Sequence, residues 1–244
     1  MRLSLFSGMY RELYDPVMTE AGFQRKGNVY YRQIEEQIVI LFTFYKFCCG
    51  REFTMAFDIF RLCDDVVFDR DAMLDPSYRY SEVIPELRGM EWSTHEYPIN
   101  LPQSLQYTRE EILPLLNRIT GYESCLEVLF ELEKKESGRA FSAAAERRIR
   151  INCIDAFFAV GKYDLALDTL WDYVQELEEY CRKFREERGF PHIREENLRI
   201  EKQYYEEMKQ FADSGDFEAI RRRIREKELR SLASFRNDFL KIKN

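Results

Sequence analysis

The spacing of apolar residues at the start of the chain predicts one amphipathic helix followed by three strands. Apolar side chains recur every three to four residues, as on the buried face of a helix, at Leu3, Phe6, Met9, Leu13 and Val17. Gly22 would end this helix. Three runs rich in β-branched and aromatic residues follow, at Val29 to Ile34, Ile38 to Phe47 and Phe53 to Leu62. We expect the helix to pack on the sheet that these runs form.

The second and third runs differ in how many of their faces are apolar. From Phe53 to Leu62, apolar residues alternate with polar or small ones, which predicts one buried face. From Ile38 to Phe47, both faces are apolar, which is typical of a central strand. Polar turns at Gly27-Asn28 and Glu35-Glu36 separate the runs, so an antiparallel meander is the simplest topology.

The stretch between Cys63 and Tyr107 is interrupted by Pro76, Pro85, Pro98 and Pro102. Proline lacks a backbone N–H and fixes its own φ angle, so these positions predict that no long regular element forms there. We expect one more strand, a short helix and a loop suited to function.

From Thr108 onward the pattern has a helical period. Thr108 and Glu111 fit a capping box, and Pro114 is expected to kink or divide the first helical segment. Later helices are predicted over about 123–135, 141–160, 167–184, 194–212 and 217–239. Similar glycine-containing turns at 160–164 and 214–218 resemble the turn inside a tetratricopeptide hairpin, and ordinary helical hairpins are the alternative.

Together these patterns predict an α+β fold. An antiparallel sheet of about three to five strands, packed by helices, would be followed by an all-α region of antiparallel hairpins. The periodicity changes near Gly121, which divides the chain into residues 1–120 and residues 121–244. One compact unit and two separable domains both fit this pattern.

A family resemblance rests on the segment from Ala21 to Arg32, whose sequence is Ala-Gly-Phe-Gln-Arg-Lys-Gly-Asn-Val-Tyr-Tyr-Arg. It resembles the bacterial family called domain of unknown function 4304, in which such a turn leads into a strand. A tryptophan and a short helix follow in that family, and Trp92 and the helix after Thr108 would fill these places. The resemblance covers about residues 1–120 and implies an architecture without an established activity. Such families sometimes occur beside toxin systems, which suggests an immunity or accessory role by association only.

Composition and charge narrow the functional classes. The 244 residues have a formal net charge of -7, which argues against a broadly basic surface for nucleic acid or anionic membranes. The six cysteines lack the spacing of a zinc or redox pair, so buried reduced thiols are expected. The chain begins without a secretory signal pattern, and no stretch approaches about 18 uninterrupted apolar residues. We expect a cytoplasmic protein that does not enter a membrane.

Recognisable catalytic motifs are missing from the sequence. Neither Gly-x-Ser-x-Gly nor Gly-x-Gly-x-x-Gly occurs, and the two histidines, His95 and His192, lie in different halves. We therefore expect no cofactor and favour a protein that is not an enzyme.

An aspartate-rich segment is a candidate metal site. It contains Asp64, Asp65, Asp69, Asp71 and Asp75. Oxygen ligands at this density suit Ca²⁺ or Mg²⁺ and would support a metal-assisted hydrolase, while a solvated loop is the simpler interpretation.

Two basic groups are candidates for partner binding. The first combines basic side chains with an aromatic ring, at Arg25, Lys26, Tyr30 and Arg32. The second lies on the last helix, at Arg221, Arg222 and Arg225. RNA binding through the C-terminal arginines is an alternative, but a solvated helix face explains them more simply. Our leading hypothesis is a non-enzymatic module that binds a protein partner.

Overall fold

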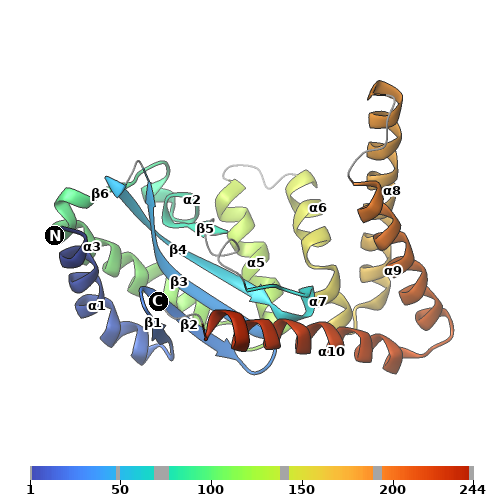
Figure 1. Cartoon of the computed structure of the whole chain (residues 1–244), viewed down its shortest axis with the longest axis horizontal. Helices are drawn as coiled ribbons and strands as arrows, with labels where there is room; N and C mark the ends of the chain where they lie inside the picture. Colours follow the sequence, from blue (N-terminus) through green and yellow to red (C-terminus); the bar gives the residue numbers. More distant parts are fainter. Residues whose placement is uncertain (1, 48–49, 69–76, 138–142, 189–193, 242–244) are drawn as a thin grey trace.

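The computed structural model describes residues 2–47, 50–68, 77–137, 143–188 and 194–241. These residues form an α+β fold, in which an antiparallel sheet in the first half precedes a helical region, as predicted (Figure 1). The sheet lies in the middle of the molecule, with helices of the first half at one side and helices of the second half at the other.

The sheet has six strands in the described part of the chain. They are β1 (Gln24–Lys26), β2 (Val29–Ile34), β3 (Ile38–Phe47), β4 (Glu52–Arg61), β5 (Tyr78–Arg79) and β6 (Trp92–Ser93). The order is β1-β2-β3-β4-β5, β6 also pairs with β4, and every pair is antiparallel. The predicted meander of three long strands is confirmed, with β3 at its centre. The prediction of a single buried face for β4 is wrong, because the intervening residues Thr54, Ala56 and Asp58 are buried as well. The added strands have only two or three residues, too few to show an alternating pattern.

Helix α1 (Arg2–Glu20) covers one face of the sheet with Phe6 and Val17 of the predicted stripe, but Met9 and Leu13 are only partly buried. Tyr10 and Tyr14 are fully buried, whereas Leu13 is only partly buried. The Tyr14 hydroxyl lies 2.8 Å from the Ser104 hydroxyl and 3.2 Å from that of Thr108. A tyrosine whose hydroxyl has a partner can enter the core, which accounts for Tyr14, whereas the buried Tyr10 hydroxyl has no hydrogen-bond partner among the described residues.

Between Cys63 and Tyr107 the structure has a short helix, as expected, but the expectation that no long regular element forms there is wrong. Helix α3 (Tyr97–Tyr107) continues through the π-helix η6 (Thr108–Ile112) into α4 (Leu113–Asn117). Pro98 lies in the first turn of α3, where the missing N–H needs no partner.

The predicted capping role of Thr108 is wrong, because this residue is buried inside the continuous helical stretch. Its hydroxyl lies 2.8 Å from the carbonyl oxygen of Ser104, one turn earlier, and 2.7 Å from the Tyr80 hydroxyl. Thr108 therefore holds the short helix α2 (Tyr80–Val83) against α3 rather than starting a helix.

The second half consists of helices joined by short turns. They are α5 (Tyr122–Ser137), α6 (Ala143–Asn152), α7 (Ile154–Ala159), α8 (Tyr163–Arg188), α9 (Glu195–Asp213), α10 (Phe217–Ser234) and the π-helix η7 (Phe235–Phe239). The helix predicted over 141–160 is divided at Cys153, whose ψ of 12° leaves the helical range. Gly161 and Gly215 adopt φ angles of +75° and +73°, which other residues rarely adopt. Helices α8 and α9 form a hairpin that projects away from the sheet (Figure 1).

The end of the chain covers the second face of the sheet (Figure 1). Val39 and Leu41 of β3 share a buried cluster with Leu232, Phe235 and Phe239. The Phe235 ring lies 5.8 Å from that of Tyr31 and 5.1 Å from that of Phe68, measured between centroids. The last helices of residues 121–244 thus complete the core of residues 1–120.

Replacing Phe235 by alanine should lower the free energy of unfolding by about 3–5 kcal/mol, because a buried phenyl ring is lost and a cavity remains. Phe235 is fully buried. The measurement is urea unfolding in a Trp171→Phe background, where the fluorescence of Trp92, next to β4, reports on the sheet.

Leu240→Ala is the matched control, since Leu240 is 36% exposed and its loss should cost less than about 1 kcal/mol. An unchanged transition at Trp92 in Phe235→Ala would mean that the sheet does not depend on the end of the chain.

Candidate binding cleft

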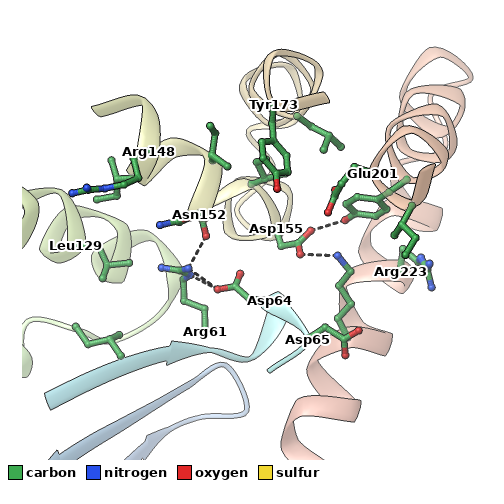
Figure 2. Close-up of a pocket in the computed structure, with 18 of the residues that line it drawn as sticks. Arg61, Asp64, Asp65, Leu129, Arg148, Asn152, Asp155, Tyr173, Glu201 and Arg223 are labelled. Atoms are coloured by element: carbon green, nitrogen blue, oxygen red, sulfur yellow. Dashed lines mark hydrogen bonds and ion pairs between the residues drawn. The ribbon is translucent and has the colours of Figure 1, made fainter. Parts of the chain in front are cut away.

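A cleft of about 830 Å³ lies where the end of β4 meets the helical half (Figure 2). Side chains from β4, α5, α6, α7, α8, α9 and α10 line it. The position of the cleft follows from the fold, because α10 returns across the sheet. The helices from α5 to α9 then enclose the space between α10 and the end of β4. Both halves of the sequence therefore contribute to the cleft.

Arg61 and Asp64 form an ion pair where the sheet enters the cleft (Figure 2). Arg61 is the last residue of β4, and Asp64 ends the 3₁₀ helix η2 (Leu62–Asp64). The Arg61 Nε donates to Asp64 Oδ2 at 2.7 Å, and Arg61 also donates to the Asn152 carbonyl at 2.6 Å. Burial raises the pKa of the Asp64 carboxyl above its usual value, against the opposing effect of Arg61. The hydrogen bond from Arg61 to the Asn152 carbonyl joins the end of β4 to the end of α6.

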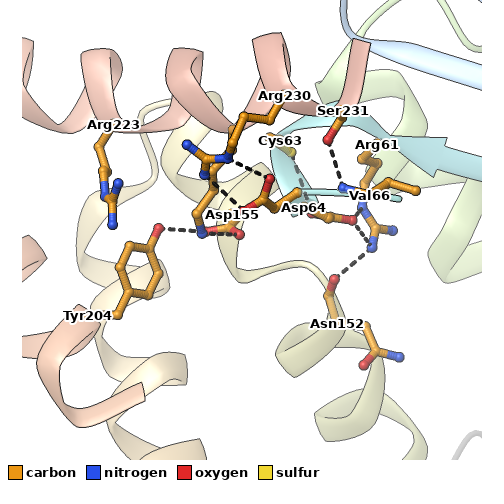
Figure 3. Close-up of polar contacts among 12 residues, drawn as sticks. Arg61, Cys63, Asp64, Val66, Asn152, Asp155, Tyr204, Arg223, Arg230 and Ser231 are labelled. Carbon is orange, nitrogen blue, oxygen red and sulfur yellow. Dashed lines mark hydrogen bonds and ion pairs between the residues drawn. The ribbon is translucent and has the colours of Figure 1, made fainter. Parts of the chain in front are cut away.

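Asp155 joins three helices at the opposite side of the cleft (Figure 3). The Tyr204 hydroxyl donates to Asp155 Oδ1 at 2.6 Å, and the Lys227 ammonium lies 2.6 Å from Oδ2. These residues come from α7, α9 and α10. The Lys227 and Asp155 side chains are only 13% and 15% exposed, so neither charge could lose its partner without a large energetic penalty. The Lys227 Nζ also lies 4.0 Å from the centre of the Tyr204 ring.

The charged side chains that line the cleft are paired with one another almost completely. Five are basic and six are acidic. The pairs are Arg61–Asp64, Arg148–Glu133, Arg223–Glu207, Lys227–Asp155 and Arg230–Asp65. Within the described residues, the Glu201 carboxylate forms no hydrogen bond or ion pair, and only burial and the charges of Lys227 and Asp155 act on it.

Glu201 lies on α9 and faces the cleft beside Asp155 (Figure 2). Its pKa is raised by burial first, with the Asp155 charge adding to the effect and Lys227 opposing it. Burial also raises the pKa of Tyr173 on α8, and the Glu201 charge raises it further. The cleft thus holds one partly buried carboxylate without a counter-ion in contact.

The predicted metal-binding aspartates are only partly within the described residues. Asp64 binds Arg61, and Asp65 binds Arg230 at 2.9 Å. Asp69, Asp71 and Asp75 lie outside the described residues. No group of three or more histidine, cysteine, aspartate or glutamate side chains is placed to hold a metal ion within the ranges that the structure describes.

The first predicted basic group fastens β1 and β2 to the rest of the fold, away from the cleft. Arg25 lies 2.8 Å from Asp15, and the Tyr30 hydroxyl donates to the same carboxylate at 2.8 Å. Arg32 donates to the carbonyl of Leu116 at 2.6 Å. The fourth member, Lys26, lies over the Phe239 ring at 4.9 Å.

The second predicted basic group is on α10 but outside the cleft. Arg221 pairs with Glu218, while Arg225 contacts both Glu36, at 2.5 Å, and Glu228, at 3.0 Å. The third member, Arg222, is exposed.

Of the residues that line the cleft, only Asp64 and Asp65 were candidates from the sequence, where they were predicted as metal ligands. Asp155 offered a signal, because a lone carboxylate in the apolar segment Ile154–Ala159 needs a partner once the helix is buried. Glu201 offered none, since α9 has many acidic and basic residues and the sequence does not show which of them turns inward.

Lys227→Met should lower the free energy of unfolding by about 3 kcal/mol, because the Asp155 carboxylate would stay buried without its counter-ion. Arg230→Met is the control, since Arg230 and Asp65 are 50% and 45% exposed and their pair should contribute less than about 1 kcal/mol. Urea unfolding gives the free energy of unfolding of both variants. If Lys227→Met and Arg230→Met lower it by the same amount, the buried Asp155 carboxylate does not depend on Lys227 for its compensation.

Glu201→Gln should make the free protein more stable than the wild type at pH 7.5. A carboxyl with a raised pKa in the folded state destabilises that state wherever it is ionised, and the penalty disappears below the pKa of the unfolded chain. Around Glu201 the charged or titratable groups are Asp155, Tyr173, Tyr204 and Lys227.

Thermal unfolding between pH 3 and pH 7.5 measures the effect, which should shrink as the pH falls. Glu206→Gln, an exposed change on the same helix, serves as control. A Glu201→Gln variant that is less stable at pH 7.5 would show that the carboxylate has a stabilising partner.

Comparison of the chain with protein-family models, with curated proteins and with solved structures found no match. The resemblance of residues 1–120 to the family of unknown function stays a prediction. Within the described residues, no helix is both long enough and apolar enough to cross a membrane.

Proposed function

We propose that this chain is a non-catalytic protein-interaction module whose binding site is the cleft together with a neighbouring hollow along α8. The second hollow has a volume of about 560 Å³ and adjoins the cleft at Tyr173, which lines both. Its other walls include Leu177, Tyr180 and Arg194. A concave surface that runs on along a helix suits an extended segment of a protein better than a compact small molecule.

The observation that supports this proposal most strongly is the exposure of large apolar side chains inside the concave surface. Tyr180 is 43% exposed in the hollow along α8, and Ile200 is 50% exposed at the cleft. Tyrosine in a pocket is typical of the few residues that contribute most of the affinity at protein interfaces. The surrounding ion pairs resemble the polar rim of such an interface.

The two alternative functions gain less support. A metal-assisted hydrolase would need Asp64 and Asp65, and both are bound to arginines. RNA binding would need free positive charge on α10, where Arg221 and Arg225 pair with carboxylates. An immunity or accessory role, suggested by the family resemblance, would be one form of protein binding.

A photo-crosslinking amino acid placed at Tyr180 or Ile200 of the full chain, in cells of its source organism, should capture one and the same protein. The matched control is Ile99, which is 72% exposed on α3, at the other end of the molecule (Figure 1). The captured protein, once purified, should bind the chain with one-to-one stoichiometry.

Tyr180→Ala should then weaken this binding at least about tenfold, because loss of a residue that anchors an interface costs about 2 kcal/mol or more. Calorimetry measures the dissociation constant. Identical products from all three positions, or none from Tyr180 and Ile200, would contradict the proposal.

A further inference from the structure

The charge balance of the cleft indicates what kind of group its occupant contributes. Each of the five basic side chains that line the cleft already contacts a carboxylate. An anionic ligand would have to share an arginine or lysine with the carboxylate that already contacts it, and among these cations only the Arg223 Nε is a buried donor without a hydrogen bond. The sixth acid, Glu201, is left over, so the described lining of the cleft has one negative charge in excess.

Neighbouring groups do not neutralise Glu201 by contact. Lys227 is the nearest cation in electrostatic effect, but its ammonium lies 2.6 Å from Asp155 and above the Tyr204 ring. Moving Lys227 to Glu201 would leave Asp155, whose side chain is only 15% exposed, without its counter-ion, which would only transfer the penalty. A positive charge for Glu201 must therefore come from outside the cleft.

The tyrosine Tyr173 points into the same cleft as the unpaired carboxylate of Glu201 (Figure 2). Tyr173 and Glu201 both line the cleft, and the Glu201 charge acts on the Tyr173 hydroxyl. A carboxylate next to an aromatic ring is a suitable environment for an ammonium or guanidinium group, which gains from ion pairing and from the negative face of the ring. A divalent metal ion would require several more oxygen ligands than this one carboxylate.

We infer that the cleft receives a lysine or arginine side chain of the protein partner, with Glu201 as its counter-ion and Tyr173 beside it. This inference rests on the proposed function and adds the chemistry of the partner. The volume of the cleft accommodates a long basic side chain, while Tyr180 along α8 contacts the neighbouring part of the same segment.

The test is a selection of peptides from a random 12-residue phage library on the full-length chain. Peptides selected on the wild type should share a lysine or arginine at one position. Replacing that residue by acetyl-lysine or citrulline, which keep the shape but remove the charge, should weaken binding at least about tenfold. The same replacement should have little effect on binding to Glu201→Gln.

Two further variants make the result specific. Selection on Glu201→Lys should yield aspartate or glutamate at the corresponding position, whereas selection on Glu206→Gln should retain the basic residue. Circular dichroism spectra and unfolding curves of all variants confirm that each is folded.

The outcomes separate this inference from the proposed function. Peptides that bind the wild type, are weakened by Tyr180→Ala and show no basic preference would overturn the role of Glu201 and leave the interaction site intact. If removing the positive charge from the peptide weakens its binding to the wild type and to Glu201→Gln by the same factor, the role of Glu201 is overturned as well. Failure to select any peptide that responds to Tyr180→Ala would overturn both.

Discussion

The apolar character of β3 on both of its faces is the constraint on which the rest of the structure depends. Ile38, Ile40 and Phe42 belong to the large core beneath α1, while Val39 and Leu41 belong to the smaller cluster on the other side. A strand buried on both faces needs two covers. The start of the chain supplies the first, and the end of the chain must return across the sheet to supply the second.

This return path also creates the cleft. Helix α10 contributes Leu232 to the sheet cluster near one end, and in the middle it holds Lys227 against Asp155. The same helix therefore completes the core and positions basic side chains of the cleft. Because the helices between Gly121 and α10 surround the space beside the sheet, stability of the fold and geometry of the cleft depend on the same contacts.

The charged groups of the cleft include ion pairs that stabilise the fold and one carboxylate, Glu201, that has no counter-ion in contact. The buried Lys227–Asp155 pair and the hydrogen bond from Tyr204 to Asp155 fix the relative positions of α7, α9 and α10, and breaking the pair would leave a charge without compensation. Glu201 is different, since burial and Asp155 both disfavour its ionised form. A group that weakens the free protein and lies in a concave surface is common at binding sites, where the partner provides the missing interaction.

The sequence by itself determined the α+β class, the bounds of β2 and β3 and the approximate positions of α5 and α8 to α10, because strand alternation and helical periodicity depend on near neighbours. It did not determine the burial of Tyr14 or the interior position of Thr108, since both depend on hydroxyl partners about ninety residues away or on other elements. Only the tertiary structure determined where the cleft lies and which charged side chains meet in it. Lys227 and Asp155 are 72 positions apart, and nothing in local spacing tells which of many acids and bases on α9 and α10 will meet, because that depends on the path by which α10 returns to cover the sheet.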